Sequence, residues 1–174
     1  PLKATPPPGQ VADLKCVWRF DFDPGAPKKD IHSYLRNRRE GPSNIYGMPV
    51  FHDGRLYVTG GGDWFWGKNE AWLKCFDPRG TGDLGTNAVR WVYPLGRHTM
   101  CTPTVQDGLV YATDAQRVLH CVEAATGKPV WTQELKGELW ASAFVAALPL
   151  AVKDKVPFVA PFTAMMNGKP KRAL

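Results

Sequence analysis

Apolar and polar residues alternate in short runs along most of the chain, and turn residues bound each run. The stretch TPTVQDGLVYATDAQRVLHCVEAATGKPVW, residues 102–131, holds three apolar runs, an Asp-Gly pair, a Thr-Gly-Lys turn and a closing Trp. Such runs between Gly, Asp and Pro residues are typical of β-strands. Asp-Gly between two apolar runs predicts a hairpin, because a type I′ turn needs positive φ at both central residues.

This pattern occurs twice. MPVFHDGRLYVTG at 48–60 repeats the opening 54 residues earlier, WLKCFDPRG at 72–80 matches VLHCVEAATG at 118–127, and AVRWVYPL at 88–95 matches KPVWTQEL at 128–135. Each unit therefore predicts a hairpin, a third strand with its turn, and a fourth strand that carries a Trp. The residues that define the repeat are Asp53, Gly54, Asp107, Gly108, Gly127, Trp91 and Trp131.

Four strands per unit at a period of about 40 to 50 residues predicts a β-propeller. A β-sandwich has strands at similar spacing but lacks this ordered repetition of turn, Cys and Trp. We therefore expect an all-β fold, an incomplete β-propeller of four-stranded antiparallel blades. Trp91 and Trp131 recur at one register, which predicts packing between blades.

The repeat divides the chain into blades. We predict one blade at 48–95, a second at 96–138, and a degenerate or truncated blade at 139–174, where Pro157 stands in place of the expected Tyr. Residues 1–47 hold KCVWRFDF at 15–22, whose Trp18 predicts the last strand of an earlier blade, and then a long loop between blades. Propellers usually close with about four to eight blades. We therefore expect a fragment of a longer chain, or copies that self-associate to close a ring.

The motif P-x-V-x-D-G-x-[LV]-Y-[VA]-T, followed by A-A-T-G-K-P-V-W, resembles the repeat of the pyrroloquinoline-quinone-like (PQQ-like) β-propeller family. The match is nearly complete at 102–131, looser at 48–93 and partial at 15–22. This family includes quinoprotein alcohol dehydrogenases and an outer-membrane assembly lipoprotein that scaffolds β-barrel insertion. The resemblance implies a propeller fold and a periplasmic or extracellular location, although no signal peptide is seen in this chain.

The dehydrogenases of this family hold their quinone on a Trp and against an adjacent Cys-Cys disulfide, with Ca²⁺ bound by Glu and Asn beside a catalytic Asp. The four cysteines here, Cys16, Cys75, Cys101 and Cys121, include no adjacent pair, and no such Glu, Asn and Asp set is recognisable. We expect no catalytic residue, no metal and no cofactor in this segment. A fragment of a PQQ- and calcium-dependent oxidoreductase remains the alternative. Cys75 and Cys121 are equivalent in neighbouring repeats and predict buried thiols.

Two insertions are candidate contact regions. GGGDWFWGKNE at 60–70 carries Trp64 and Trp66, which either cover a pocket, present an aromatic contact surface, or tuck over the blade edge. The loop 23–47 carries three arginines that we expect to point outward, toward an acidic partner or simply toward solvent. These are Arg36, Arg38 and Arg39.

A second candidate contact lies between the blades, in GRHTMCTP. Arg97 and His98 stand there, and His98 is a conceivable catalytic base. His52 aligns with Gln106 in the next repeat, which indicates a surface residue.

The amino-acid composition and net charge of the chain exclude some classes of function. Hydrophobic residues make up 44% of the chain, with Gly 17 and Pro 16, as expected for a globular protein of many short elements. The net charge of +6 weakly favours anionic partners but forms no compact basic face, so we predict no nucleic-acid binding. No apolar run approaches the ~20 residues of a membrane span. The sequence therefore favours a non-catalytic scaffold whose partner is a protein, a small ligand or the remaining blades of a parent chain.

Overall fold

The computed structural model of the 174-residue chain describes residues 8–9, 15–65, 67–137, 139, 141–146 and 158–161. Within these residues the fold is all-β, with two short 3₁₀ helices, η1 (Ile31–Tyr34) and η2 (Thr86–Ala88). Two four-stranded antiparallel sheets and two smaller strand pairs make up the molecule, which confirms an incomplete β-propeller. Residues 147–157 and 162–174 of the predicted degenerate blade, including Pro157, lie outside the described residues.

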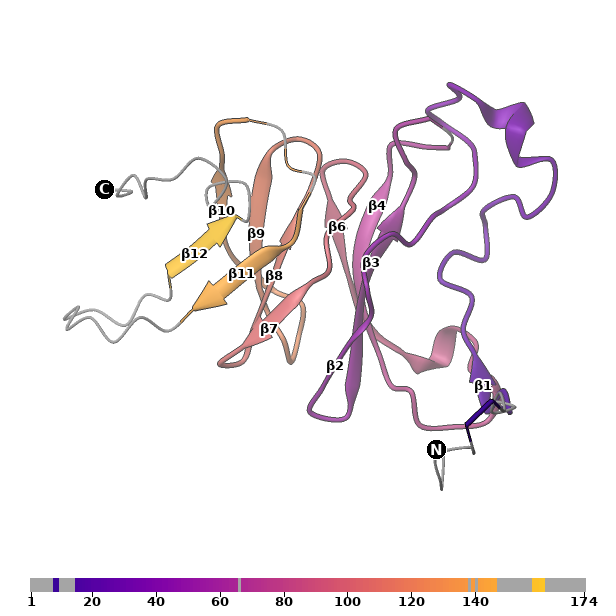
Figure 1. The fold of residues 1–174 in the computed structure, drawn as a ribbon, viewed down its shortest axis with the longest axis horizontal. Helices are drawn as coiled ribbons and strands as arrows, with labels where there is room; N and C mark the ends of the chain where they lie inside the picture. The colour runs from indigo at the N-terminus through magenta and orange to yellow at the C-terminus, as the bar shows by residue number, and fades with distance from the viewer. Residues whose placement is uncertain are drawn as a thin grey trace.

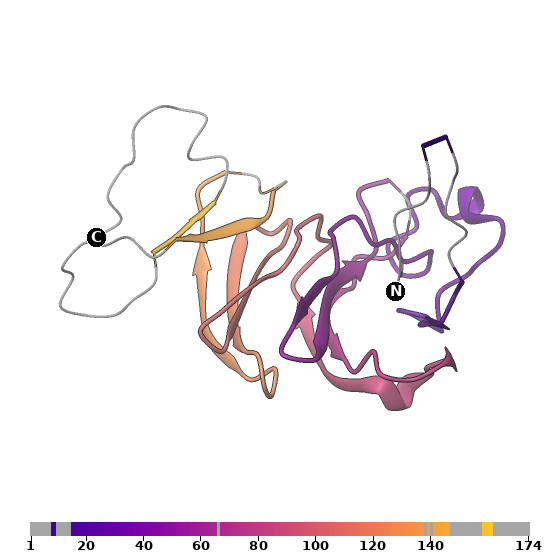
Figure 2. The same cartoon turned by 60° about the horizontal axis from the view of Figure 1, so that its bottom comes forward.

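The two complete blades have the same topology. The first blade comprises β2 (Val50–His52), β3 (Arg55–Gly61), β4 (Ala71–Phe76) and β6 (Val89–Leu95), paired in that order. The second comprises β7 (Thr104–Gln106), β8 (Leu109–Thr113), β9 (Val118–Glu123) and β10 (Pro129–Glu134) in the same order. Figures 1 and 2 show the two sheets stacked beside each other.

The Asp-Gly pairs form the first hairpin of each blade. The φ angles are 47° and 70° at Asp53 and Gly54, and 51° and 76° at Asp107 and Gly108. These positive values are the ones that a type I′ turn requires, and they match the right-handed twist of the flanking strands. The two hairpins therefore lie at the same end of their blades.

The main core lies between the two blades. Strand alternation places one face of β3, β4 and β6 against the opposing face of β8 and β9. The buried residues of this layer are Tyr57, Ala71, Leu73, Cys75, Trp91, Leu95, Cys101, Val110, Ala112, Val122 and Ala124. Cys75 and Cys121 are fully buried free thiols, as predicted. Burial raises the pKa of Cys75 to about 11, so both thiols behave as small apolar groups.

Trp91 of the first blade packs against one glycine of the second blade, Gly127. Its indole Nε1 donates a hydrogen bond to the Ala124 carbonyl at 3.0 Å. A Cβ atom at Gly127 would lie 2.6 Å from the Trp91 ring, and Gly127 also has φ +71°. Only glycine meets both demands, because it lacks Cβ and tolerates positive φ. The Trp of one repeat and the Gly of the next therefore form one contact.

A third unit begins beyond the second blade. Strand β11 (Ala143–Ala146) pairs antiparallel with β12 (Phe158–Pro161). Thr113 Oγ1 donates to the Ala141 carbonyl at 2.9 Å, just as Thr59 Oγ1 in the first blade donates to the Cys101 carbonyl. Since the same bond recurs, β11 lies against the second blade in the way that β7 lies against the first.

The N-terminal segment 15–28 covers the other face of the first blade. Phe20 stacks on Phe76 with ring centroids 4.3 Å apart, and Trp18 meets Phe76 edge-on at 6.1 Å. Its strand β1 (Trp18–Arg19) pairs in parallel with β5 (Gly82–Asp83). The hypothesis that 15–22 ends an earlier blade remains a prediction, but Trp18 does lie on a blade face, as Trp91 does.

Candidate functional site

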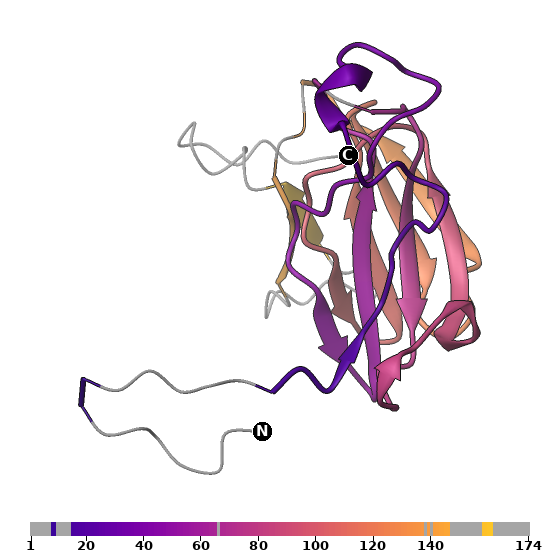
Figure 3. The ribbon, with the colours of Figure 1, turned by 90° about the vertical axis from the view of Figure 1, so that its right-hand side faces the viewer.

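The connections opposite the Asp-Gly hairpins form one end of the molecule, which we call the loop end. It gathers the segments 23–47, 60–70, 96–103 and 114–117. Figure 1 shows this end at the top, with η1 projecting from it, and Figure 3 shows the same loops above the strands. Both insertions that the sequence singled out lie here.

The two insertions bind each other along their backbones. Asn44 and Gly61 exchange two backbone hydrogen bonds of 2.6 and 3.0 Å. The Arg36 amide donates to the Phe65 carbonyl, and the Asn69 amide donates to the Arg38 carbonyl, both at 3.1 Å. Residues 31–46 and 61–69, apart from Trp66, thus form one layer, which we call the loop platform. Trp66 lies outside the described residues.

Asp63 is the centre of the loop platform. It is 1% exposed, and its carboxylate accepts hydrogen bonds from Asn44 Nδ2 at 2.8 Å and from the Tyr46 hydroxyl at 2.7 Å. Burial together with this carboxylate raises the pKa of Tyr46 to about 12. A buried carboxylate is tolerated where donors surround it. Asp63 therefore fixes one insertion to the other.

Arg38 is also part of this network. Its Nη1 donates to the Asp63 carbonyl at 2.7 Å, and its Nη2 donates to the Trp64 carbonyl. The expectation that all three arginines of the loop point outward is wrong for Arg38, because its planar guanidinium satisfies two carbonyls of the facing loop. Arg36 and Arg39 are exposed.

Close approach of the two loops depends on a glycine. Gly67 has φ +86°, and a Cβ atom there would lie 2.4 Å from the Pro42 carbonyl oxygen. Neither the conformation nor the distance allows a side chain. The platform is consequently a tightly packed layer and not two independent loops.

Trp64 of the platform lies against His98, which belongs to the segment between the blades. Their rings meet edge-on with centroids 5.5 Å apart. His98 is only 4% exposed, and its Nδ1 has no hydrogen-bond partner among the described residues. Burial, with Arg97 and Arg38 nearby, lowers the pKa of His98. The half-buried Arg97 thus acts on His98 through its charge, while Trp64 covers His98 and remains 40% exposed.

A second polar network joins the blades. The buried Asp114 Oδ2 lies 2.9 Å from His120 Nε2, and His120 Nδ1 lies 3.0 Å from the Tyr93 hydroxyl. Because an ionised carboxylate only accepts, Nε2 carries the proton and Nδ1 accepts from Tyr93. Burial opposes ionisation of Asp114, but His120 and backbone amides hold its pKa below the usual value.

Sequence reasoning missed Asp63, Asp114 and this His120 chain. His120 aligns with Lys74 of the first repeat, and both side chains face the unit that precedes their blade. A polar residue beside buried Leu and Cys in a central strand is the signal that indicates such a contact. Asp63 left no comparable signal, because its partners come from an insertion outside the repeat.

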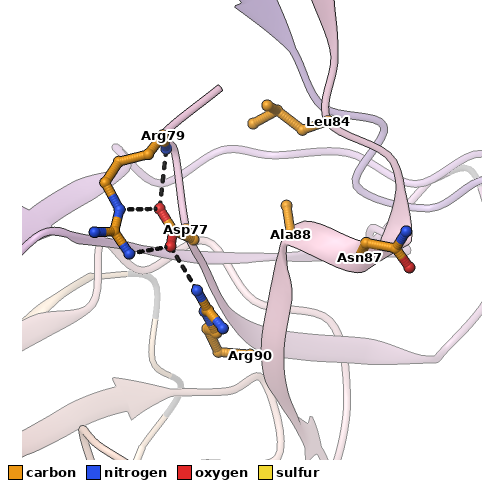
Figure 4. Close-up of a pocket in the computed structure, with 6 residues that line it drawn as sticks. All are labelled: Asp77, Arg79, Leu84, Asn87, Ala88 and Arg90. Atoms are coloured by element: carbon orange, nitrogen blue, oxygen red, sulfur yellow. Dashed lines mark hydrogen bonds and ion pairs between the residues drawn. The ribbon is translucent and has the colours of Figure 1, made fainter. Parts of the chain in front are cut away.

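The opposite end of the first blade has a shallow depression (Figure 4). Arg79 Nη2 and Arg90 Nη2 both lie 2.6 Å from Asp77 Oδ2. Hydrogen bonds from Arg79, then from Arg90, lower the pKa of Asp77. The Asp77 carboxylate cancels one of the two positive charges and engages both guanidinium groups, which weakens the attraction of this site for an external anion. The lining residues are Asp77, Arg79, Leu84, Asn87, Ala88 and Arg90.

The described residues do not fit the quinone and calcium site of the family's dehydrogenases. The chain lacks adjacent cysteines, and the buried carboxylates Asp63 and Asp114 already accept hydrogen bonds from protein donors. Within the described part of the chain, no group of three His, Cys, Asp or Glu side chains is placed to hold a metal ion. That part also contains no helix long and apolar enough to cross a membrane.

A comparison with known families identifies the repeat. Residues 69–164, more than half of the chain, match the family described as outer membrane protein assembly factor BamB, a family of PQQ-like repeats. The match spans the second blade and the last two strands of the first, β4 and β6. Comparison with curated proteins gives no significant match.

Proposed function

Because the chain belongs to the PQQ-like propeller family described as outer membrane protein assembly factor BamB, we propose that it is a non-catalytic propeller segment that binds another protein through its loop platform. The family membership supports a propeller segment in general. The binding role rests on the loop end of this chain.

One observation carries the proposal: the two insertions are held rigidly and yet present large apolar side chains. Asp63 and Arg38 are engaged inside the platform, whereas Leu35 is 53% exposed and Phe65 is 59% exposed. A loop that is ordered by its own hydrogen bonds loses little conformational entropy when it binds. Exposed apolar groups on a fixed loop are a feature of protein interfaces.

The chemistry of the site favours binding over catalysis. His98 is the one sequence candidate for a base, but it is buried and shielded by Trp64. Its lowered pKa keeps it neutral at pH 7. A general base must come within hydrogen-bond reach of the proton that it removes, and the burial of His98 opposes such a contact.

We also infer an extracytoplasmic location from the family alone. The remaining blades of a parent chain, or further copies of this chain, are the other proposed partners. Within this chain, segment 15–28 and β11 cover the outer faces of the two complete blades. Further blades would therefore continue the stack beyond these segments and would not meet the loop platform.

Site-specific photo-crosslinking in the source cells tests the proposal. A photoreactive phenylalanine analogue at Phe65 should give a discrete adduct with another protein. Phe51 is a matched control, because it is 65% exposed but lies in β2 beside the Asp-Gly hairpin, at the opposite end. Adducts at Phe65 that do not exceed those at Phe51 would contradict a binding role for the platform. Fractionation of the same cells tests the location.

A further inference from the structure

We propose that the loop platform recognises a protein segment that combines carboxylate groups with large apolar side chains. This inference rests on the proposed binding function and specifies the class of partner. It follows from the apolar surface, the charge and the rigidity of the platform.

The apolar part of the surface comes from both insertions. The hydrogen bond from the Arg36 amide to the Phe65 carbonyl sets the end of η1 beside the aromatic loop. Six large apolar side chains are exposed on the platform. They are Ile31 at 40%, Leu35 at 53%, Ile45 at 47%, Tyr46 at 49%, Trp64 at 40% and Phe65 at 59%. Aromatic and aliphatic side chains of this kind are the usual anchors of an interface.

The charge around these anchors is basic. Residues 28–40 contain five basic residues against two acidic ones. Arg38 is engaged inside the platform, but Arg36 and Arg39 are exposed on the same loop. An exposed guanidinium binds a carboxylate through two parallel hydrogen bonds, so these two arginines favour Asp or Glu in a partner.

The arginines are held in place by the backbone. Arg36 has φ +65°, a conformation that non-glycine residues rarely adopt. The bond between its amide and Phe65 fixes this conformation. A strained residue that carries a free charged side chain, next to exposed apolar groups, is typical of a binding site.

A protein partner fits this surface better than an anionic membrane. Glu40 is exposed beside Arg39, and the Glu70 side chain, whose Oε2 lies 3.5 Å from Lys68 Nζ, is 65% exposed at the edge of the platform. These carboxylates repel a uniformly negative surface, whereas a folded or extended segment can place its own charges between them.

Fluorescence anisotropy with three labelled peptides of equal length tests the inference on the unmodified chain. The first peptide alternates Asp or Glu with Leu and Trp, the second replaces its acids with Lys, and the third replaces its apolar residues with Ser. We expect the first to bind about tenfold more tightly than the other two, and its affinity to fall with added salt. Equal binding of the first two peptides would overturn the proposal.

Matched variants locate the binding. Arg36→Asn with Arg39→Gln should weaken binding of the first peptide about tenfold, and Asn tolerates the backbone at position 36. The control, Arg19→Gln with Lys128→Gln, removes the same charge from exposed positions elsewhere and should leave binding unchanged. Wild-type affinity in the platform variant would contradict the assigned surface.

Sedimentation with vesicles that contain anionic phosphatidylserine completes the test, because tighter binding to them than to the first peptide assigns the platform to a lipid surface instead.

The two proposals fail in different ways. A specific adduct at Phe65 without preference for the acidic peptide would remove this inference and keep the binding function. If neither the adduct at Phe65 nor the preference for the acidic peptide is observed, the proposed binding function and this inference are both rejected.

Discussion

The two complete blades share their strands but differ at the loop end. Each has one Asp that is 1% exposed, located just after its second strand: Asp63 in the first blade and Asp114 in the second. Asp114 closes a tight turn by accepting from the Gln116 and Val118 amides at 2.9 and 3.2 Å. It also accepts from the Gly96 amide at 2.9 Å. Asp63 likewise accepts from the amide two residues on, that of Phe65, at 2.8 Å, but its other carboxylate oxygen accepts from the inserted loop, through Asn44 and Tyr46.

This difference separates two roles within one fold. The second blade uses its buried carboxylate to bind the preceding blade, whereas the first uses its carboxylate to build an outward platform. The strands determine how the blades stack, whereas the buried loop carboxylates determine which segments are exposed at the loop end. Five predictions probe this comparison, from the largest expected effect to the smallest.

The equivalent tryptophans should differ in their contribution to stability. Trp91 is 9% exposed and pairs with Ala124 and Gly127, so Trp91→Ala should lower the free energy of unfolding by about 3 to 5 kcal/mol. Trp131 is only half-buried against Tyr111, and Trp131→Ala should cost about 1 to 2 kcal/mol. Denaturant melting measures both. Equal losses would show that the two blade interfaces are equivalent.

Loss of the second blade's carboxylate should destabilise the whole structure. Asp114→Ala leaves His120 and the amide of Gly96 without their acceptor, which should cost about 3 kcal/mol. Glu134→Ala is the control, since this side chain is 74% exposed. An Asp114 variant as stable as the control would contradict the role of Asp114 as a link between blades.

The same residue predicts a pH dependence. The folded-state pKa of Asp114 lies below its ordinary value of 3.8. The stability that it contributes is therefore present above about pH 4 and is lost as the pH falls through the folded pKa. Melting curves between pH 7 and pH 2 should show a smaller acid-induced loss in Asp114→Asn than in the wild type.

Loss of the first blade's carboxylate should act locally. Asp63→Ala removes the acceptor of Asn44 and Tyr46, so the loop platform should open while the blades stay folded. Hydrogen exchange of residues 36–46 should accelerate about tenfold, which corresponds to about 1.4 kcal/mol of local stability. In Asp114→Ala, exchange of residues 36–46 should accelerate only as far as the lower global stability of this variant allows. Unchanged exchange in the Asp63 variant would contradict its central position.

The smallest effect concerns His98. Its pKa is lowered in the folded state, so the unfolded chain binds a proton first as the pH falls below about 6.5. Stability should therefore decline from this pH toward the folded-state pKa. His98→Phe keeps a ring beside Trp64 and removes the unpartnered Nδ1, so it should abolish this decline and change stability at pH 7 by less than about 1 kcal/mol. A decline of the same size in the variant would assign it to another group.

Local signals in the sequence were sufficient to predict the blades. Asp53-Gly54 and Asp107-Gly108 determine hairpins through their own φ preferences, and the recurrence of Tyr, Cys and Trp places one face of each strand in a core. The candidate site was predicted only in part. The sequence located both insertions, together with Trp64 and His98, but not the contact between the insertions. Arg38 and Asp63 are 25 residues apart and belong to no repeat, so no period reveals that they meet.

The contact between Trp91 and Gly127 has a consequence for how the number of blades can change in evolution. The first repeat supplies the tryptophan and the second supplies the glycine that receives it, and the second repeat also carries Trp131 at the position of Trp91. Tandem duplication of the second repeat would therefore produce a copy that already has both members of this contact, Gly127 and Trp131, in its sequence. Loops that leave this pair untouched, such as the insertion at 60–70, are free to diverge. Blade number and loop chemistry can thus evolve independently of each other.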